Sequence, residues 1–252
     1  MFDLSDKLAL VTGSSRGLGN TLASALAGAG ARIILHGRDS KSLDNAAVEW
    51  EKSHGVRPDT ILFDVQDAAS VEAAVSDLIE KFGIPDILVN NAGIQRRSPF
   101  AEFAISDWDD VIATNLSSVF YVSRFIVPHM ILRGSGKIIN IASVQSELGR
   151  QTIAPYAASK GGVAMLTRGM TADLARHNIQ VNTLSPGYFA TDMNNALVAD
   201  EKFTAWLEQR TPAGRWGRPE ELVGALVFLA SSASDFVTGQ NIFVDGGMTA
   251  VV

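Results

Sequence analysis

The sequence predicts one doubly wound α/β domain over residues 1–252, in which a parallel sheet of about seven strands carries helices on both faces. Short runs rich in leucine and β-branched residues alternate along the chain with longer segments of helical pattern. This alternation is typical of parallel strands joined by right-handed crossovers. No linker, repeat or low-complexity tract interrupts it. With 46% hydrophobic and 19% charged residues, a chain of 252 residues can bury a single large core.

The expected elements follow from these runs in order. Seven segments have the length and composition of buried strands, namely 7–12, 31–37, 60–65, 86–91, 137–143, 179–185 and 241–247. The pattern between them predicts helices over 18–31, over 68–83 with a start at Ser70 and a stop at Gly83, and over 156–178. The strands end on small or polar residues, and ligands of such sheets bind beyond the carboxyl ends of the strands.

Composition argues against several classes of function. The chain has no cysteine, and its four histidines show no metal-ligand spacing, so we expect neither disulfides nor a metal site. The formal net charge of −6 argues against a nucleic-acid surface, which needs a basic field. No stretch approaches the roughly 18 to 20 uninterrupted apolar residues of a membrane span, and the first residues lack a basic region followed by an apolar signal core. We therefore expect a soluble, cytoplasmic protein that acts on a small molecule.

A glycine-rich loop, in LVTGSSRGLG, follows the first predicted strand. Gly13, Gly17 and Gly19 would let the backbone turn tightly and approach a pyrophosphate at the N-terminus of the next helix. The spacing Gly-x-x-x-Gly-x-Gly differs from the Gly-x-Gly-x-x-Gly of many dinucleotide folds, and an ordinary strand-to-helix turn is the alternative. The position of the loop after the first strand of an alternating α/β chain favours the phosphate cradle.

Tyr156 and Lys160 lie four positions apart in PYAASKGGVAML, so a helix would place them on one face. For this pair alone, a packed tyrosine and a solvated lysine is the alternative. A unit charge about 4 Å away contributes on the order of 4 kcal/mol at an effective dielectric near 20, or roughly three pKa units. Lys160 is therefore expected to lower the pKa of Tyr156 from about 10 towards neutrality, where a phenol can exchange a proton with a substrate oxygen.

Five motifs occur in the order found in the short-chain dehydrogenase/reductase family: TGSSRGLG, NNAG, SV at 143 and 144, YAASK and PGYFAT. The chain resembles that family over essentially its whole length, which implies a Rossmann-type fold and hydride transfer with a nicotinamide cofactor. The resemblance implies a catalytic set of Asn115, Ser143, Tyr156 and Lys160. It implies cofactor contacts from Gly13, Ser15, Arg16, Gly17, Leu18, Gly19, Arg38, Asp64, Val65, Asn91, Ala92, Gly93, Tyr156, Lys160, Pro186, Gly187 and Thr191.

The resemblance also implies a role for each catalytic side chain. Ser143 would donate a hydrogen bond to the substrate oxygen, where negative charge accumulates during the reaction. Lys160 would bind the nicotinamide ribose hydroxyls in addition to acting on Tyr156. Asn115 would support a water-mediated proton path.

The segment after the second strand, ARIILHGRDSKSL, bears on the choice of cofactor. NAD-preferring relatives commonly place an acid there to hold the adenosine ribose, whereas this chain has Gly37 at that position and Arg38 next to it. Arg16 could join Arg38 around a 2′-phosphate, so we expect NADP to be preferred over NAD. The alternatives are that either arginine is a solvated surface residue and that Asp39 reaches the ribose.

Cationic and amide side chains follow two strand ends near the expected reacting centre. Arg96 and Arg97 come after NNAG, and Gln145 and Arg150 come after the catalytic serine. They suggest a polar, anionic substrate held by Arg97, Gln145 and Arg150 beside the catalytic serine and tyrosine. Solvation or a salt bridge is the alternative for each arginine.

Within the family, the segments NNAGIQRR, QSELGR, FTAWL and RTPAGRWG are most similar to members that exchange a hydride at C5 of D-gluconate and 5-keto-D-gluconate. A sugar-acid carboxylate would suit the arginines. The resemblance further implies a homotetramer and a mobile substrate lid over about 190–217, in which Trp206 and Trp216 close over the site or merely pack.

Two other functions remain open. One is reduction of another ketone, such as a sugar, a 2-keto-3-deoxy sugar acid or a 3-oxoacyl substrate. The other is nucleotide sensing without turnover, and the intact catalytic set argues against it.

Overall fold

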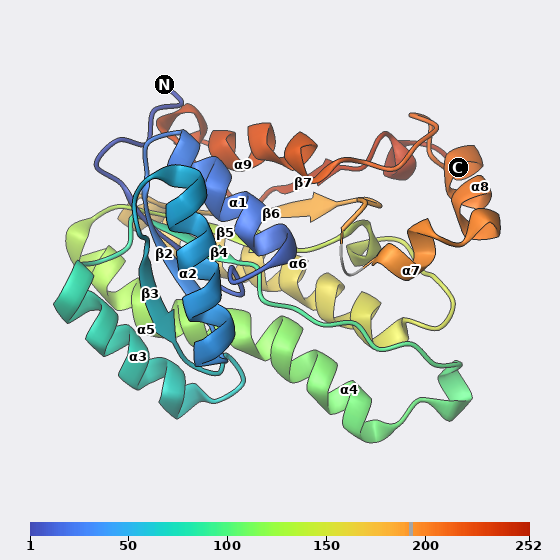
Figure 1. Cartoon of the computed structure of the whole chain (residues 1–252), viewed down its shortest axis with the longest axis horizontal. Helices are drawn as coiled ribbons and strands as arrows, with labels where there is room; N and C mark the ends of the chain where they lie inside the picture. The colour runs from blue at the N-terminus through green and yellow to red at the C-terminus, as the bar shows by residue number, and fades with distance from the viewer. Residues whose placement is uncertain (192–193) are drawn as a thin grey trace.

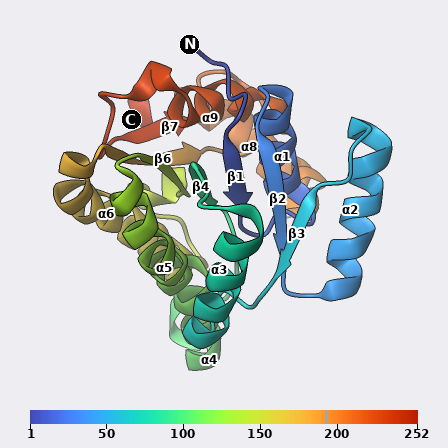
Figure 2. The ribbon, with the colours of Figure 1, turned by 90° about the vertical axis from the view of Figure 1, so that its left-hand side faces the viewer.

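A computed structural model describes residues 1–191 and 194–252. Its sheet has seven parallel strands in the order β3-β2-β1-β4-β5-β6-β7 (Figures 1 and 2). The strands are β1 Leu8–Val11, β2 Arg32–Gly37, β3 Asp59–Leu62, β4 Ile87–Asn90, β5 Gly136–Ile141, β6 Ile179–Pro186 and β7 Asn241–Val244. The predicted doubly wound sheet and each of its seven strands are confirmed, with boundaries that differ by at most three residues.

The α-helices are α1 Gly17–Gly28, α2 Ser40–His54, α3 Ala68–Phe82, α4 Ile105–Ile112, α5 Ser118–Arg133, α6 Ala154–Leu174, α7 Asn195–Val198, α8 Glu201–Arg210 and α9 Val223–Ala230. A π-helical turn, η2 Ala113–Ser117, joins α4 to α5. Short 3₁₀ turns are η1 Phe100–Glu102, η3 Val144–Ser146, η4 Ala175–His177, η6 Pro219–Leu222, η7 Ser232–Ser234 and η8 Met248–Ala250.

Several predicted helix boundaries differ from the structure, since α1 ends at Gly28 instead of residue 31 and α6 gives way to the 3₁₀ turn η4 after Leu174 instead of running to residue 178. Two of the starts differ for identifiable reasons. The α3 helix begins at Ala68 rather than at Ser70, because Asp67 caps it by accepting a hydrogen bond from the Ala69 amide at 3.0 Å. Its predicted stop at Gly83 is confirmed. The α6 helix begins at Ala154, two residues early, because Pro155 lies in the first turn, where a missing amide hydrogen is tolerated.

The strand β1 shows how the core divides into two layers. Its alternate residues point to opposite faces, so that Val11 packs with α1 and α9 while Leu10 packs with α3 and α5. Figures 1 and 2 show these helices on the two sides of the sheet. Strand order reverses at β1, which lies between β2 and β4. The residues beyond the carboxyl ends of β1 and β4 therefore face a common crevice, where ligands of such sheets bind.

One helical run in the described chain, Ile105–Arg133, is long and apolar enough to cross a membrane by length and composition alone, with a mean hydropathy of 1.3 over its most apolar window. In the fold, 44% of that window is buried, and α5 lies along α3. Packing of α5 against α3 accounts for the buried part of this apolar run.

Candidate active site

The glycine-rich loop joins β1 to α1 and forms a cradle for an anion. Gly13 and Gly17 have φ angles of 64° and 54°, in the left-handed region that glycine adopts most easily. A Cβ on Gly19 would lie 2.4 Å from the Gly13 carbonyl oxygen, so a larger residue does not fit there. Among the described residues no side chain caps the N-terminus of α1, and its first amides are free to bind a phosphate. The loop thus fits the pyrophosphate of a nicotinamide cofactor.

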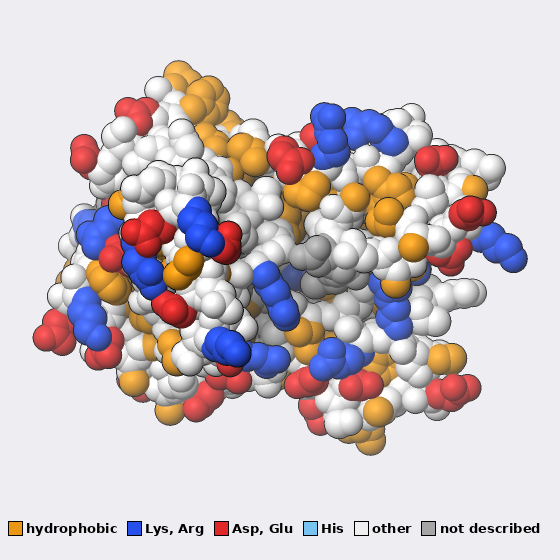
Figure 3. All heavy atoms as spheres, in the orientation of Figure 1, with side chains coloured by type: hydrophobic (Ala, Val, Ile, Leu, Met, Phe, Trp, Pro, Cys, Tyr) orange, Lys and Arg blue, Asp and Glu red, His pale blue; other side chains and the backbone are white. Residues whose placement is uncertain are grey.

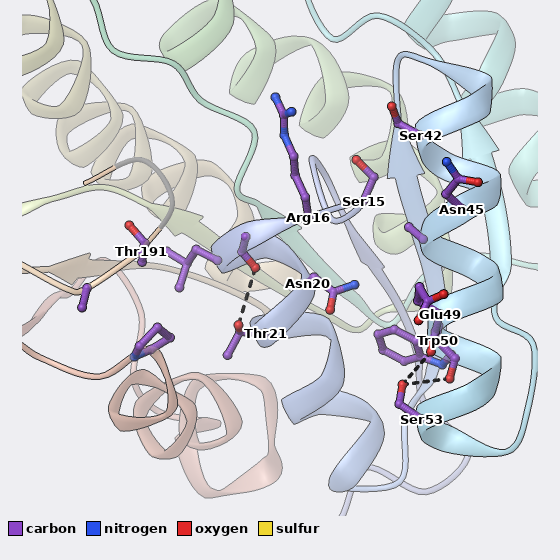
Figure 4. Close-up of a pocket in the computed structure, with 15 residues that line it drawn as sticks. Ser15, Arg16, Asn20, Thr21, Ser42, Asn45, Glu49, Trp50, Ser53 and Thr191 are labelled. Atoms are coloured by element: carbon purple, nitrogen blue, oxygen red, sulfur yellow. Dashed lines mark hydrogen bonds between the residues drawn. The ribbon is translucent and has the colours of Figure 1, made fainter. Parts of the chain in front are cut away.

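A cavity of about 670 Å³ opens beside this loop, between α1 and α2 (Figure 4). The labelled residues of α1 and α2 lie on opposite sides of it, and Thr191 lies beyond α1. Five of the predicted cofactor residues line this cavity: Ser15, Arg16, Gly17, Leu18 and Thr191. The structure therefore brings together the glycine loop and the segment after β6, although they are far apart in the sequence.

Most of the other predicted cofactor residues follow the carboxyl ends of three strands, at the same edge of the parallel sheet. Asp64 and Val65 come after β3, Asn91, Ala92 and Gly93 come directly after β4, and Pro186 and Gly187 close β6. Thr12 ties two of these segments together, because its hydroxyl accepts hydrogen bonds from the Asn91 amide at 2.9 Å and the Ala92 amide at 3.1 Å. These hydrogen bonds hold the segment after β4 against the glycine loop.

His36, near the end of β2, forms a hydrogen bond with the glycine-rich loop. The Gly13 amide donates to His36 Nδ1 at 2.8 Å, and His36 Nε2 lies 3.1 Å from the Phe63 carbonyl oxygen. Because Nδ1 accepts, the proton of the neutral ring lies on Nε2 and is donated to Phe63. Burial lowers the pKa of His36 to about 4. The ring thus links the phosphate loop to the end of β3, just before Asp64.

The arginines that were expected to select the cofactor lie at the surface beside the cradle. Arg16 and Arg38 are exposed, and neither forms a salt bridge with the described residues. Asp39 instead caps α2, since its carboxylate accepts a hydrogen bond from the Ser42 amide at 2.8 Å. The Ser42 side chain, and then this backbone hydrogen bond, lower the pKa of Asp39. The cap occupies Oδ1 of Asp39 and holds the carboxylate at the start of α2.

Asn115 lies in the π-helical turn, where the extra residue turns its amide towards the site. Its Oδ1 accepts from the Ile94 amide at 2.8 Å, and its Nδ2 donates to the Ile94 carbonyl at 3.0 Å and to Ser159 Oγ at 3.1 Å. Asn115 thereby connects the segment after β4 to α6. Its role in a water-mediated proton path stays a prediction.

The other three catalytic candidates converge from β5 and α6. Ser143 is buried just after β5, and its side chain lies near the Tyr156 phenol. Lys160 is 4% exposed, its Nζ lies 5.7 Å from the centroid of the Tyr156 ring, and it donates to the Ile141 carbonyl at 2.6 Å. The predicted helix face is confirmed, because α6 presents both side chains to the same place.

The expected effect of Lys160 on Tyr156 is wrong for this structure. The pKa of Tyr156 is raised, mainly by burial of the phenol, and the Ser143 hydrogen bond only partly opposes this. Burial also lowers the pKa of Lys160 to about 8, so the ammonium is itself disfavoured. The sequence-based expectation assumed a unit charge about 4 Å away at an effective dielectric near 20, whereas burial in the structure penalises both charged forms.

The two adjacent arginines after β4 have different partners. Arg96 forms salt bridges with Asp107 at 3.4 Å and with Asp110 at 3.0 Å, so α4 holds it at the surface. Arg97 donates to Gln95 Oε1 at 2.9 Å, and partial burial together with the nearby charge of Arg150 lowers its pKa. Within residues 1–191 and 194–252 no carboxylate forms a salt bridge with Arg97 or Arg150. Basic side chains also lie along the middle of the face shown in Figure 3.

An aromatic cluster covers the space next to these arginines. The Arg150 guanidinium lies 4.6 Å from the Phe203 ring centroid and 5.9 Å from that of Tyr188. Trp206 and Trp216 contact the same two rings, with centroids 5.2 to 6.2 Å apart. Both tryptophans of the predicted lid therefore pack in this cluster, while positions 192 and 193 of the lid lie outside the described residues. Gln145 Nε2 is 3.5 Å from Tyr188 Oη, which joins the cluster to the segment after Ser143.

Sequence reasoning missed three residues of the site. Tyr188 was visible within PGYF and Phe203 within FTAWL, but neither pattern indicates what the ring contacts. His36 had no signal, because a lone histidine in an apolar strand is most often a core residue.

Comparison with known proteins gives full-length matches. A family model described as enoyl-(acyl carrier protein) reductase matches residues 13–249. Gluconate 5-dehydrogenase of Gluconobacter oxydans is 56% identical over 249 residues, which are 99% of this chain and 97% of that protein. The 5-keto-D-gluconate 5-reductase of Escherichia coli K12 is 54% identical over 252 residues, 100% of this chain and 99% of that protein.

A solved structure is similar over the same length. The crystal structure of a gluconate 5-dehydrogenase from Burkholderia cenocepacia, in complex with NADP and tartrate, is 54% identical and matches with a TM-score of 0.96 over 100% of this chain and 98% of that chain. With the glycine cradle and the convergence of Ser143, Tyr156 and Lys160, these matches show that the chain belongs to the short-chain dehydrogenase/reductase family.

Proposed function

We propose that the protein transfers a hydride between NADP(H) and C5 of the pair D-gluconate and 5-keto-D-gluconate. The observation that carries this proposal is the convergence of two arginines, Arg97 and Arg150, around Tyr188, which also lies near Tyr156. Partial burial and then the charge of Arg150 lower the pKa of Arg97, and an anionic substrate group would offset both effects. The relatives named for gluconate and 5-keto-D-gluconate support the same substrate.

The proton chemistry follows from the state of the catalytic side chains. Bound NADPH supplies the hydride. The raised pKa keeps the Tyr156 phenol protonated at neutral pH, so it can donate its proton to the ketone oxygen while Ser143 donates a hydrogen bond to the same oxygen. Lys160 holds its ammonium against the Ile141 carbonyl beneath the tyrosine.

NADP fits the rim of the cradle better than NAD. The place where NAD-preferring relatives carry an acid is Gly37, and Asp39 is engaged as a helix cap. Arg16 and Arg38 are both exposed beside the loop, where guanidinium groups match the geometry of a 2′-phosphate. The Burkholderia cenocepacia structure in complex with NADP supports this choice.

A substrate screen with two arginine variants tests the proposal. The assay is absorbance of the reduced nicotinamide with 5-keto-D-gluconate, a neutral keto-sugar and a 3-oxoacyl thioester. Arg97 is exposed, so solvent would screen its interaction with the substrate carboxylate. We therefore expect Arg97→Ala to lower kcat/KM for 5-keto-D-gluconate by only about tenfold. Arg96→Ala is the matched control and should leave kcat/KM within about twofold, because Arg96 is held by α4.

Two outcomes would contradict the assignment. Equal losses for Arg97→Ala on the charged and neutral substrates would mean that Arg97 orders its own loop rather than binding a carboxylate. Wild-type activity on the neutral ketone or the thioester, with none on 5-keto-D-gluconate, would leave the reductase chemistry and remove the sugar acid.

We also propose that the protein is a cytoplasmic homotetramer. Large apolar side chains remain exposed on α5, on α6 and near β7, with Phe120 51%, Met165 61% and Phe236 103% exposed. Large apolar side chains that are exposed in one chain become buried where chains of an oligomer pack together. Light scattering coupled to size-exclusion chromatography gives the molar mass directly, and a monomer mass would contradict the tetramer.

A further inference from the structure

Gln145 carries a buried side-chain amide whose oxygen has no hydrogen-bond partner among the described residues. The residue is 8% exposed and lies in η3, two positions after the catalytic serine. Its backbone amide donates to Ser143 Oγ at 3.2 Å, which fixes its place beside the serine. Its side-chain Oε1 is buried and has no hydrogen-bond partner among the described residues. Its Nε2 makes one long contact, 3.5 Å to Tyr188 Oη.

An unpaired buried carbonyl costs folding free energy, so such a group is a candidate for a partner that the protein itself does not supply. Water or a ligand can supply that partner. The amide lies between the two ends of the proposed substrate, because Ser143 marks the reacting carbon and Tyr188 is close to both Arg97 and Arg150. The hydrogen-bond donor to Gln145 Oε1 would therefore come from the middle of the substrate.

We propose that Gln145 binds a hydroxyl group on the carbon chain between the reacting carbon and the carboxylate. The inference rests on the proposed function and specifies it further, because it makes a hydroxylated carbon chain part of what the site recognises. A hydroxyl suits the amide in either orientation, since it can donate to Oε1 and accept from Nε2. A keto acid without hydroxyls would leave the carbonyl unpaired, and sites built to bind a hydroxyl discriminate strongly against such analogues.

The experiment compares two keto acids that differ in these hydroxyls. In 5-oxohexanoate the carboxylate and the ketone are separated as in 5-keto-D-gluconate, but the carbons between them carry no hydroxyl. Gln145→Met keeps the length and approximate volume of the side chain and removes both polar atoms. We expect Gln145→Met to lower kcat/KM for 5-keto-D-gluconate by about 10- to 100-fold, and to lower it at least tenfold less for 5-oxohexanoate.

Thermal unfolding of the free protein gives a second readout. Since the substitution removes an unpaired buried carbonyl, the Tm of Gln145→Met should equal or exceed that of the wild type. The dissociation constant for NADPH, measured by fluorescence titration, should not change.

Three results would overturn the inference. Equal losses on the two keto acids would show that Gln145 positions Ser143 instead of binding a hydroxyl. No loss on 5-keto-D-gluconate would show that the amide does not contact the substrate, and a clear fall in Tm would show that it is already paired in the free protein. Failure of the proposed function looks different, because it appears in the wild type as slow turnover of 5-keto-D-gluconate before any substitution.

Discussion

A fall in pH from about 7.5 to about 5 should weaken the fold through His36. Protonation of Nδ1 would break the hydrogen bond from the Gly13 amide and leave a charge in a buried ring. Burial lowers the pKa of His36 in the folded chain to about 4, although Asp64 nearby acts in the opposite direction. An unfolded histidine has a pKa near 6.5. The unfolded chain therefore binds the proton first, and this contribution to stability is complete above about pH 6.5 and is lost as the pH falls towards 4.

The size of the effect follows from the two pKa values. A pH of 5 is about 1.5 units below the pKa of the unfolded imidazole, which is therefore mostly protonated, while the folded imidazole is still largely neutral. Proton binding to the unfolded chain then lowers the free energy of unfolding by about 2 kcal/mol. Well below pH 4 the loss in the free energy of unfolding reaches its limit of about 3 kcal/mol. For a chain of this length, about 2 kcal/mol corresponds to a Tm lower by roughly 4 to 8 °C.

Equilibrium urea unfolding of the wild type and of His36→Asn isolates this contribution. The asparagine Oδ1 can accept from the Gly13 amide, but the side chain does not titrate. Carboxylates reduce the stability of both proteins at low pH, so the informative quantity is the difference between the two losses. The wild type should lose about 2 kcal/mol more than the variant between pH 7.5 and 5. Equal losses would refute the reasoning, because they would mean that His36 does not gain a proton on unfolding.

Three further predictions concern the catalytic set and the cofactor. Tyr156→Phe should lower turnover, measured by absorbance, about 100-fold or more, and should leave the NADPH affinity, measured by fluorescence titration, unchanged. Turnover near that of the wild type would show that Tyr156 is not the proton donor. Lys160→Ala should weaken both turnover and NADPH affinity, and unchanged affinity would remove its contact with the ribose. Gly37→Asp with Arg38→Leu should shift the ratio of kcat/KM values from NADP towards NAD, because the new carboxylate repels a 2′-phosphate. A wild type that already prefers NAD would contradict this last prediction.

The fold was predictable because the strands are buried on both faces and read as apolar runs separated by helical patterns. Helix starts were less predictable, since Asp67 and Ser70 are both good capping residues and only the structure shows which one accepts the hydrogen bond. The shared helix face of Tyr156 and Lys160 followed from their spacing, because four residues make about one turn.

The electrostatics of the site could not be predicted in the same way. The direction of the pKa shift of Tyr156 depends on how deeply the packed chain buries the phenol, which a local spacing does not encode. The different surroundings of Arg96 and Arg97 depend on Asp107 and Asp110 of a helix that begins eight residues later. Local sequence gives the types of charge, and tertiary packing decides which charges are paired.

The π-helical turn that carries Asn115 has a consequence for how the chain can vary. Such a turn holds one residue more than a regular α-helical turn, so it rotates the helix that follows by about 100° relative to an uninterrupted helix. The face of α5 that is buried against α3 is set by that rotation. Deletion of one residue within Ala113–Ser117 would restore a regular helix, turn that face away from its partner and move the Asn115 amide away from Ile94. The position of Asn115 and the packing of α5 therefore both depend on this π-helical turn, so an insertion or deletion within it would change both.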